Sequence, residues 1–121
     1  QGSDFTEMAL LYTDFSGAKL WETNFSAAQL EHAQFVKSSL KLAVFRGARL
    51  NGANLSGADL RGANFSGADL RAANLSNATV QPTFFRGMGV NANFEGAFFD
   101  SRTTLPFDRA MAESLGMIYI P

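Results

Sequence analysis

A five-residue repeat runs through most of this chain and constrains its fold more than any other feature. A bulky apolar residue stands at every fifth position from Phe5 to Val90. Neither the 3.6-residue period of a helix nor the 2-residue period of a strand produces this spacing. The chain must therefore turn a corner every five residues, and repeats of this kind indicate a solenoid. The clearest copies are Ala53-Asn54-Leu55-Ser56-Gly57, Ala58-Asp59-Leu60-Arg61-Gly62, Ala63-Asn64-Phe65-Ser66-Gly67 and Ala68-Asp69-Leu70-Arg71-Ala72.

The repeated unit, Ala-(Asp/Asn)-(Leu/Phe)-X-X, resembles that of the pentapeptide-repeat proteins over roughly residues 3–101. The resemblance implies an all-β fold, a right-handed quadrilateral parallel β-helix in which four pentapeptides make one coil. It also implies that the central apolar residue of each unit points inward, together with the small residue two positions before it.

A coil of four pentapeptides predicts a second period of twenty residues, and the sequence shows it. Central residues twenty apart are mostly of one type, so stacked coils should form columns of identical side chains. We expect four core columns: Phe5, Phe25, Phe45, Phe65 and Phe85; Leu10, Leu30, Leu50, Leu70 and Val90; Phe15, Phe35, Leu55 and Leu75; Leu20, Leu40, Leu60 and Val80.

The phase of the repeat shifts by one residue near Asn91, after which Phe94 and Phe99 continue the ladder. We interpret the shift as one face that is a residue short. An irregularity of this kind is typical of the end of a solenoid, where a cap covers the last core layer. We therefore expect a β-helix over residues 1–102 and a C-terminal cap over residues 103–121 of the same domain.

Within this cap, Asp108 is placed to N-cap a short helix over residues 109–115, which Gly116 ends. Met111 and Leu115 lie four residues apart on one helical face, and an extended apolar strip follows over residues 117–120. We expect these residues to plug the open end of the solenoid. The segment 104–119 also resembles the C-terminal caps of pentapeptide-repeat proteins from cyanobacteria and the thylakoid lumen.

The residues needed for common catalytic and metal sites are scarce. The chain has no cysteine and a single histidine, His32, which excludes histidine-cluster metal sites and Cys-His nucleophiles. The glycines recur at the spacing of corners and lack the context of a phosphate-binding loop. We interpret His32 as a surface residue near Tyr12 and Gly52, and we expect no catalytic residue, cofactor or metal.

Charge argues against one activity known in the resembled family, the mimicry of duplex DNA toward type II topoisomerases. A mimic needs a strongly negative rod, whereas the formal net charge here is −1. The middle of the chain is basic, and its cations fall on different faces, so we interpret them as solvation and expect no nucleic-acid partner. These cations are Lys37, Lys41, Arg46, Arg49, Arg61, Arg71 and Arg86.

One compact apolar patch is expected on the outside. By the twenty-residue period, Trp21 and Leu42 share a face, with Lys41 beside them. The patch has two explanations, a contact with a protein partner or a surface covered by an N-terminal segment.

Together these features favour a noncatalytic scaffold or protein-interaction module. The alternatives are the topoisomerase-binding DNA mimic and, third, an enzyme. No apolar stretch is long enough to cross a bilayer, so we expect no membrane insertion. We expect a soluble protein of the cytoplasm, or of the thylakoid lumen or periplasm if a leader has been removed. The sequence names neither the partner nor the oligomeric state.

Overall fold

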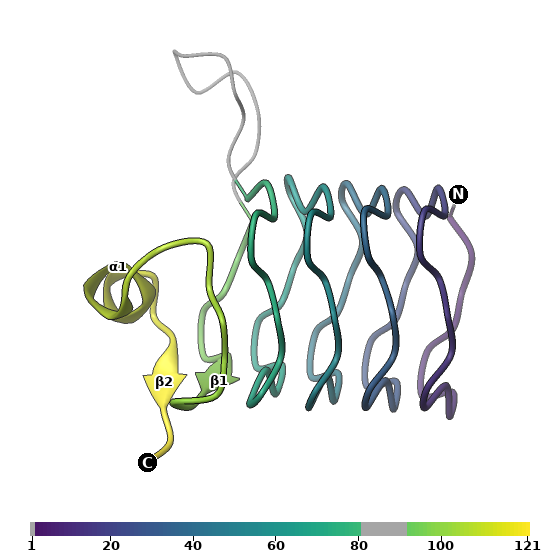
Figure 1. Cartoon of the computed structure of the whole chain (residues 1–121). Helices are drawn as coiled ribbons and strands as arrows, with labels where there is room; N and C mark the ends of the chain where they lie inside the picture. Colours follow the sequence, from purple (N-terminus) through teal and green to yellow (C-terminus); the bar gives the residue numbers. More distant parts are fainter. Residues whose placement is uncertain (1, 81–91) are drawn as a thin grey trace.

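The protein is a stack of coils that advance along a single axis (Figure 1). The computed structural model describes residues 2–80 and 92–121. Up to Thr79, every bridged pair is parallel and joins residues twenty positions apart, from Asp4 with Asn24 to Asp59 with Thr79. Four such pairs occur per coil, so each coil has four sides and takes four pentapeptides. None of the helices in these described ranges is long and apolar enough to span a membrane.

Each pentapeptide forms one side and one corner. At the first corner, the carbonyl of Phe5 accepts a hydrogen bond from the N–H of Met8, and Glu7 between them has a φ of 60°. The Asp or Asn before the central residue closes the turn, because its side-chain oxygen accepts from the N–H two residues on, as Asn24 does from Ser26 at 2.9 Å. Short polar side chains suit this role. The repeat therefore encodes a corner in every unit.

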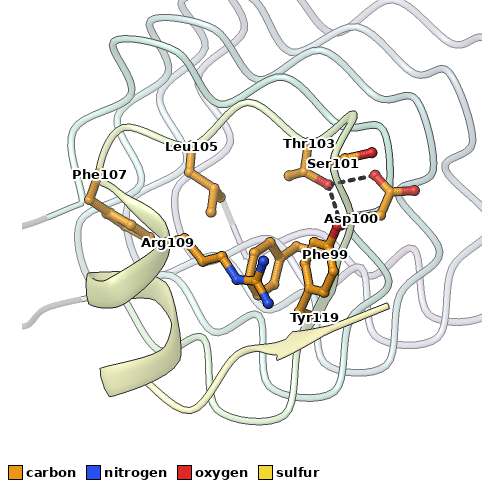
Figure 2. A pocket seen from close by; sticks show the side chains of 8 residues that line it. All are labelled: Phe99, Asp100, Ser101, Thr103, Leu105, Phe107, Arg109 and Tyr119. Atoms are coloured by element: carbon orange, nitrogen blue, oxygen red, sulfur yellow. Dashed lines mark hydrogen bonds between the residues drawn. The ribbon is translucent and has the colours of Figure 1, made fainter. Parts of the chain in front are cut away.

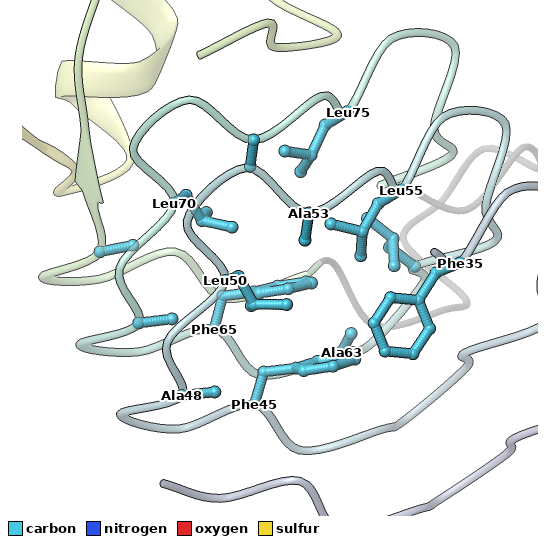
Figure 3. Packing of buried hydrophobic residues seen from close by; sticks show 14 of the residues in the cluster. Phe35, Phe45, Ala48, Leu50, Ala53, Leu55, Ala63, Phe65, Leu70 and Leu75 are labelled. Atoms are coloured by element: carbon cyan, nitrogen blue, oxygen red, sulfur yellow. The ribbon is translucent and has the colours of Figure 1, made fainter. Parts of the chain in front are cut away.

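The core consists of the central residues and the alanines two positions before them (Figure 3). The rings of Phe45 and Phe65 stack at 4.8 Å with planes 3° apart, close to the ~4.8 Å spacing of neighbouring strands. Phe35 meets Phe45 edge-on at 5.7 Å. The following expected core residues are fully buried: Phe25, Phe35, Phe45, Phe65, Leu30, Leu40, Leu50, Leu55, Leu60, Leu70 and Leu75.

The first coil is less buried than the coils that follow. Its central residues are only partly buried because they pack against one neighbouring coil, whereas the central residues of the middle coils pack against two. These first-coil residues are Phe5, Leu10, Phe15 and Leu20.

The register after residue 80 differs from our interpretation. Asn64 pairs with Asn93, which lies 29 positions on, so this coil holds nine extra residues. The interpretation of a missing residue was wrong, because nine extra residues and one missing residue shift a five-residue repeat by the same phase. Phe94 consequently stacks on Phe65, at 5.2 Å, in the place we expected for Phe85.

Phe85 itself lies outside the described residues, as do Val90 and Arg86. In the second column the place expected for Val90 belongs to Phe99, because the neighbouring Phe98 pairs with Asp69. The side chains of Phe94 and Phe99 are buried.

The chain ends in a strand, a helix and a second strand. β1 (Phe98–Phe99) pairs in parallel with β2 (Ile118–Tyr119), and α1 (Arg109–Ser114) lies between them in sequence. The Asp108 side chain accepts from the N–H of Met111 at 2.8 Å and so N-caps α1. Gly116 follows α1 with a φ of 84°, a conformation that favours glycine.

The expected plug was assigned in part to the wrong residue. Met117 is buried and Leu115 is partly buried, as expected, whereas Met111 and Ile118 are 43% and 45% exposed. Ala112, which we did not expect in the plug, is fully buried. The helix presents Ala112 to the coil because a small side chain permits close approach, and Met111 is thereby turned outward.

Candidate functional site

Trp21, Lys41 and Leu42 lie at one corner of two adjacent coils. The N–H of Glu22, the residue after Trp21, donates to the carbonyl of Lys41, which fixes the two corners one above the other. The ammonium of Lys41 lies 5.2 Å from the centre of the Trp21 ring, within cation–π range. The indole N–H donates to Ser39 Oγ. Trp21 is thus held in one orientation while 45% of it stays exposed.

The next coil extends this corner with an ion pair. Arg61 donates to Asp59 from Nε at 2.8 Å and from Nη2 at 2.5 Å. The hydrogen bond from Arg61 is the main cause that lowers the pKa of Asp59, and the positive charge of Lys41 adds to the effect. The corner therefore presents an aromatic ring, two cations and one ionised carboxylate over three coils. We call Trp21, Lys41 and Leu42 the tryptophan corner.

Leu42 occupies the corner position that has a positive φ in other pentapeptides too, as at Glu22 and Lys37. Its φ is 60°, whereas the equivalent residue one coil on is Gly62, with a φ of 71°. The left-handed conformation costs a non-glycine residue roughly 1–2 kcal/mol. Leu42 is also 48% exposed, so burial offsets only part of this cost.

A pocket of ≈ 270 Å³ opens at the other end of the molecule, between the last coil and α1 (Figure 2). Its apolar walls are Phe99, Leu105, Phe107 and Tyr119. The Arg109 guanidinium lies 3.8 Å from the centre of the Tyr119 ring. Its polar lining comprises Asp100, Ser101, Thr103 and Arg109.

Asp100 fixes the final corner. Its Oδ1 accepts from the N–H of Ala72 at 3.1 Å, whereas in earlier coils the equivalent N–H donates to a backbone carbonyl, as Gly52 does to Arg71. Oδ2 accepts from Arg102 Nη2 at 2.7 Å. Burial alone raises the pKa of Asp100, but the hydrogen bonds from Arg102 and Ala72 lower it to about 2. A carboxylate thus replaces a carbonyl where the coil is irregular.

The chain matches the family model described as pentapeptide repeats, with eight copies over residues 10–47, 38–77 and 48–87. The matched residues make up more than half of the sequence. The chain belongs to the pentapeptide-repeat family. Its coils are therefore those of the right-handed β-helix of this family.

Solved structures of other pentapeptide-repeat proteins resemble this one. A protein from the thylakoid lumen of Arabidopsis thaliana is 36% identical, with 95% of this chain and 75% of that one covered and a TM-score of 0.53. A protein from Nostoc PCC 7120 is 30% identical, with coverages of 88% and 84% and a TM-score of 0.48. One from Cyanothece 51142 is 23% identical, with coverages of 86% and 88% and a TM-score of 0.49. No curated protein sequence matches the chain.

The remaining residues singled out from the sequence are dispersed over this pentapeptide-repeat structure. His32 is exposed and stacks on Tyr12 at 5.0 Å. Among residues 2–80 and 92–121, no group of three His, Cys, Asp or Glu side chains is arranged to hold a metal ion. Three cations of the basic middle form ion pairs: Arg49 with Glu31, Arg61 with Asp59, and Arg71 with Asp69.

Sequence reasoning missed the C-terminal polar residues of this pentapeptide-repeat protein. Asp100 and Arg102 repeat the Asp-X-Arg pattern of Asp59-Leu60-Arg61 and Asp69-Leu70-Arg71, and that pattern could have identified them. No signal of this kind existed for Arg109 and Leu105, because they meet only when the C-terminal segment folds against the last coil.

Proposed function

We propose that this chain is a noncatalytic scaffold that binds a protein partner through the tryptophan corner. The single observation that carries the proposal is Trp21, which stays 45% exposed although Ser39 and Lys41 hold its ring in place. Exposed tryptophans that are held rigidly are frequent anchors of protein interfaces. The exposed Leu42 at the same corner adds apolar surface beside it.

The charges at the tryptophan corner indicate which kind of partner surface would be complementary to it. Lys41 and Arg61 flank the apolar groups, and Asp59 neutralises one of the two cations. A partner with an apolar pocket for Trp21 and an acidic rim would complement this surface. The cations of the middle coils disfavour the DNA-mimic alternative, because a topoisomerase would meet them with its own basic DNA-binding surface.

We also propose that residues 103–121 are the cap of the β-helix and fold with residues 1–102 as one domain. The burial of Ala112 and Met117 and the pairing of β1 with β2 support this assignment. The Arabidopsis relative comes from the thylakoid lumen. We extend that compartment to this chain as a proposal, which immunoblots of fractionated source cells test.

Affinity capture with two double variants tests the tryptophan corner. The first variant combines Trp21→Ala with Leu42→Asp, a residue that tolerates the left-handed conformation. The control combines Met111→Ala with Leu11→Asp, which removes two apolar residues of similar exposure, 43% and 44%, away from the corner. Both variants should melt near the temperature of the wild type.

The proposal expects a partner that is captured by the wild type and the control and lost with the corner variant. With the purified partner, the corner variant should bind roughly thirtyfold or more weakly, as is usual for interface hot spots. Identical capture by all three proteins would show that the corner is not the contact surface.

A further inference from the structure

The pocket at the C-terminal end exists because the last core layer is covered on only part of its area. Leu105 continues the column of Leu75, since the neighbouring Thr104 pairs with Asn74. Leu75 is fully buried, but Leu105 is only partly buried. Phe107 packs edge-on against Phe94 at 5.7 Å, and Tyr119 packs against Phe99 at 5.4 Å. The space over Leu105 between these two contacts is the pocket.

Two polar side chains of the pocket lining, Thr103 and Asp100, already have hydrogen-bond partners and so offer little to a ligand. Thr103 Oγ1 donates to the carbonyl of Leu70 at 2.9 Å and accepts from the N–H of Asp100 at 3.0 Å. The Asp100 carboxylate accepts from Arg102 and Ala72, and Arg102 balances its charge. The Thr103 and Asp100 side chains therefore stabilise the corner of the coil and leave little for a ligand to bind.

Arg109 differs from Thr103 and Asp100 because it is a cation whose terminal nitrogens face the pocket without a partner among the described residues. Its Nε lies 3.5 Å from Glu113 Oε2, and both side chains are more than half exposed, so this ion pair is weak. Its two terminal nitrogens donate no hydrogen bond to any residue of ranges 2–80 and 92–121. The planar guanidinium lies over Tyr119, at the edge of the apolar walls (Figure 2).

We propose that this pocket binds a small monocarboxylate with a compact apolar body. Two parallel N–H groups of a guanidinium match the two oxygens of a carboxylate. The apolar body would lie against Phe99, Leu105 and Phe107. The volume, ≈ 270 Å³, is just under the ~300–1,000 Å³ of pockets for drug-sized ligands, so a single ring or a short chain fits. The site is independent of the tryptophan corner.

Titration with 3-phenylpropionate, followed by amide NMR shifts, tests the proposal. We expect a Kd on the order of 0.1 mM for a ligand of this size, with shifts concentrated at Leu105, Phe107 and Tyr119. The matched neutral probe is 3-phenylpropionamide, which has the same shape without the charge. The amide should bind roughly ten- to hundredfold more weakly, because it loses charge-assisted hydrogen bonds to Arg109.

Two variants locate the site. Arg109→Gln should weaken 3-phenylpropionate binding by the same ten- to hundredfold factor, whereas the control Arg46→Gln, at an exposed corner of the solenoid, should not. Leu105→Trp should fill the pocket and abolish binding without touching Arg109. The melting temperatures of the variants should equal that of the wild type, so that a loss of binding cannot be caused by unfolding. Absence of saturable binding to the wild type, equal binding of acid and amide, or full affinity in both pocket variants would overturn the proposal.

Discussion

The middle coils and the C-terminal end of this protein use the same backbone ladder but satisfy it in different ways. In the middle coils the period of twenty is unbroken, and identical rings stack, as in Phe25 on Phe45 at 5.0 Å. At the C-terminal end the paired residues lie 29 and 30 positions apart, and the Asp100 side chain takes over from a backbone carbonyl. Regular repeats therefore stabilise the fold through packing, whereas an irregular coil depends on individual polar side chains.

The largest expected effect tests the packing half of this comparison. Phe45→Ala removes a fully buried ring from the middle of its column, where Phe25 and Phe65 stack on its two sides. The free energy of unfolding should fall by roughly 3–5 kcal/mol, the usual cost of truncating a buried phenylalanine. Urea denaturation measures this loss. Met111→Ala, at an exposed position, is the control and should change stability by less than about 0.5 kcal/mol. Similar losses in both variants would contradict the inward assignment of the column.

A smaller effect tests whether the irregular C-terminal coil depends on individual polar side chains. Asp100→Ala should lower the free energy of unfolding by about 1.5–3 kcal/mol, because the charged hydrogen bonds from Arg102 and Ala72 are lost. Asp14→Ala is the control, since Asp14 is exposed and accepts only from Ser16 in its own turn. The free energy of unfolding should fall much less in Asp14→Ala than in Asp100→Ala. Equal losses at the two positions would show that the irregular corner needs no special support.

The pH dependence of the same residue gives a second measurement. The pKa of Asp100 is about 2 in the folded protein and 3.8 in the ordinary carboxyl group. The folded state therefore favours the ionised form, and the resulting stabilisation is complete above about pH 4 and is lost as the pH falls toward 2. The difference in urea midpoint between the wild type and Asp100→Asn should shrink across this window. A difference that stays constant from pH 7 to pH 2.5 would contradict the assignment.

The smallest effect concerns the strained corner. Leu42→Gly should be more stable than Leu42→Ala by about 1 kcal/mol, because glycine adopts a φ of 60° without steric cost. The same pair of substitutions at Val44, which forms a bridge on a side of the coil, should give the opposite order. Thermal melts of the four variants make the comparison. The same order at both positions would mean that Leu42 carries no backbone strain.

The sequence predicts the coils well because each one uses the same local contacts. Phe25, Phe45 and Phe65 could be placed in one column from their twenty-residue spacing and the coil of four pentapeptides that the family resemblance implies, and the bridges of the structure confirm that spacing. The family assignment is likewise confirmed. The register beyond residue 80 could not be predicted in this way, because a period of five reveals the phase of an interruption but not its length.

The candidate sites divide in the same manner. The twenty-residue period was enough to predict that Trp21, Lys41 and Leu42 are neighbours, because residues twenty positions apart lie one above the other in adjacent coils. The orientation of α1 depends instead on which side chain lets the helix approach the last coil, and periodicity alone could not choose Ala112 over Met111. Arg109 joins the pocket for the same reason. Features that arise from the folding of the C-terminal segment leave little trace in the repeat.

The corner after Val80 is a practical place to attach new sequence to this protein. Ala92 N–H donates to the Val80 carbonyl at 2.9 Å, the same contact that closes an ordinary corner between residues three apart. The hydrogen-bonded frame of the coil therefore closes despite the nine additional positions between these residues. A peptide tag or a fluorescent label introduced there should report on the protein in cells while the stacked rings beneath stay undisturbed.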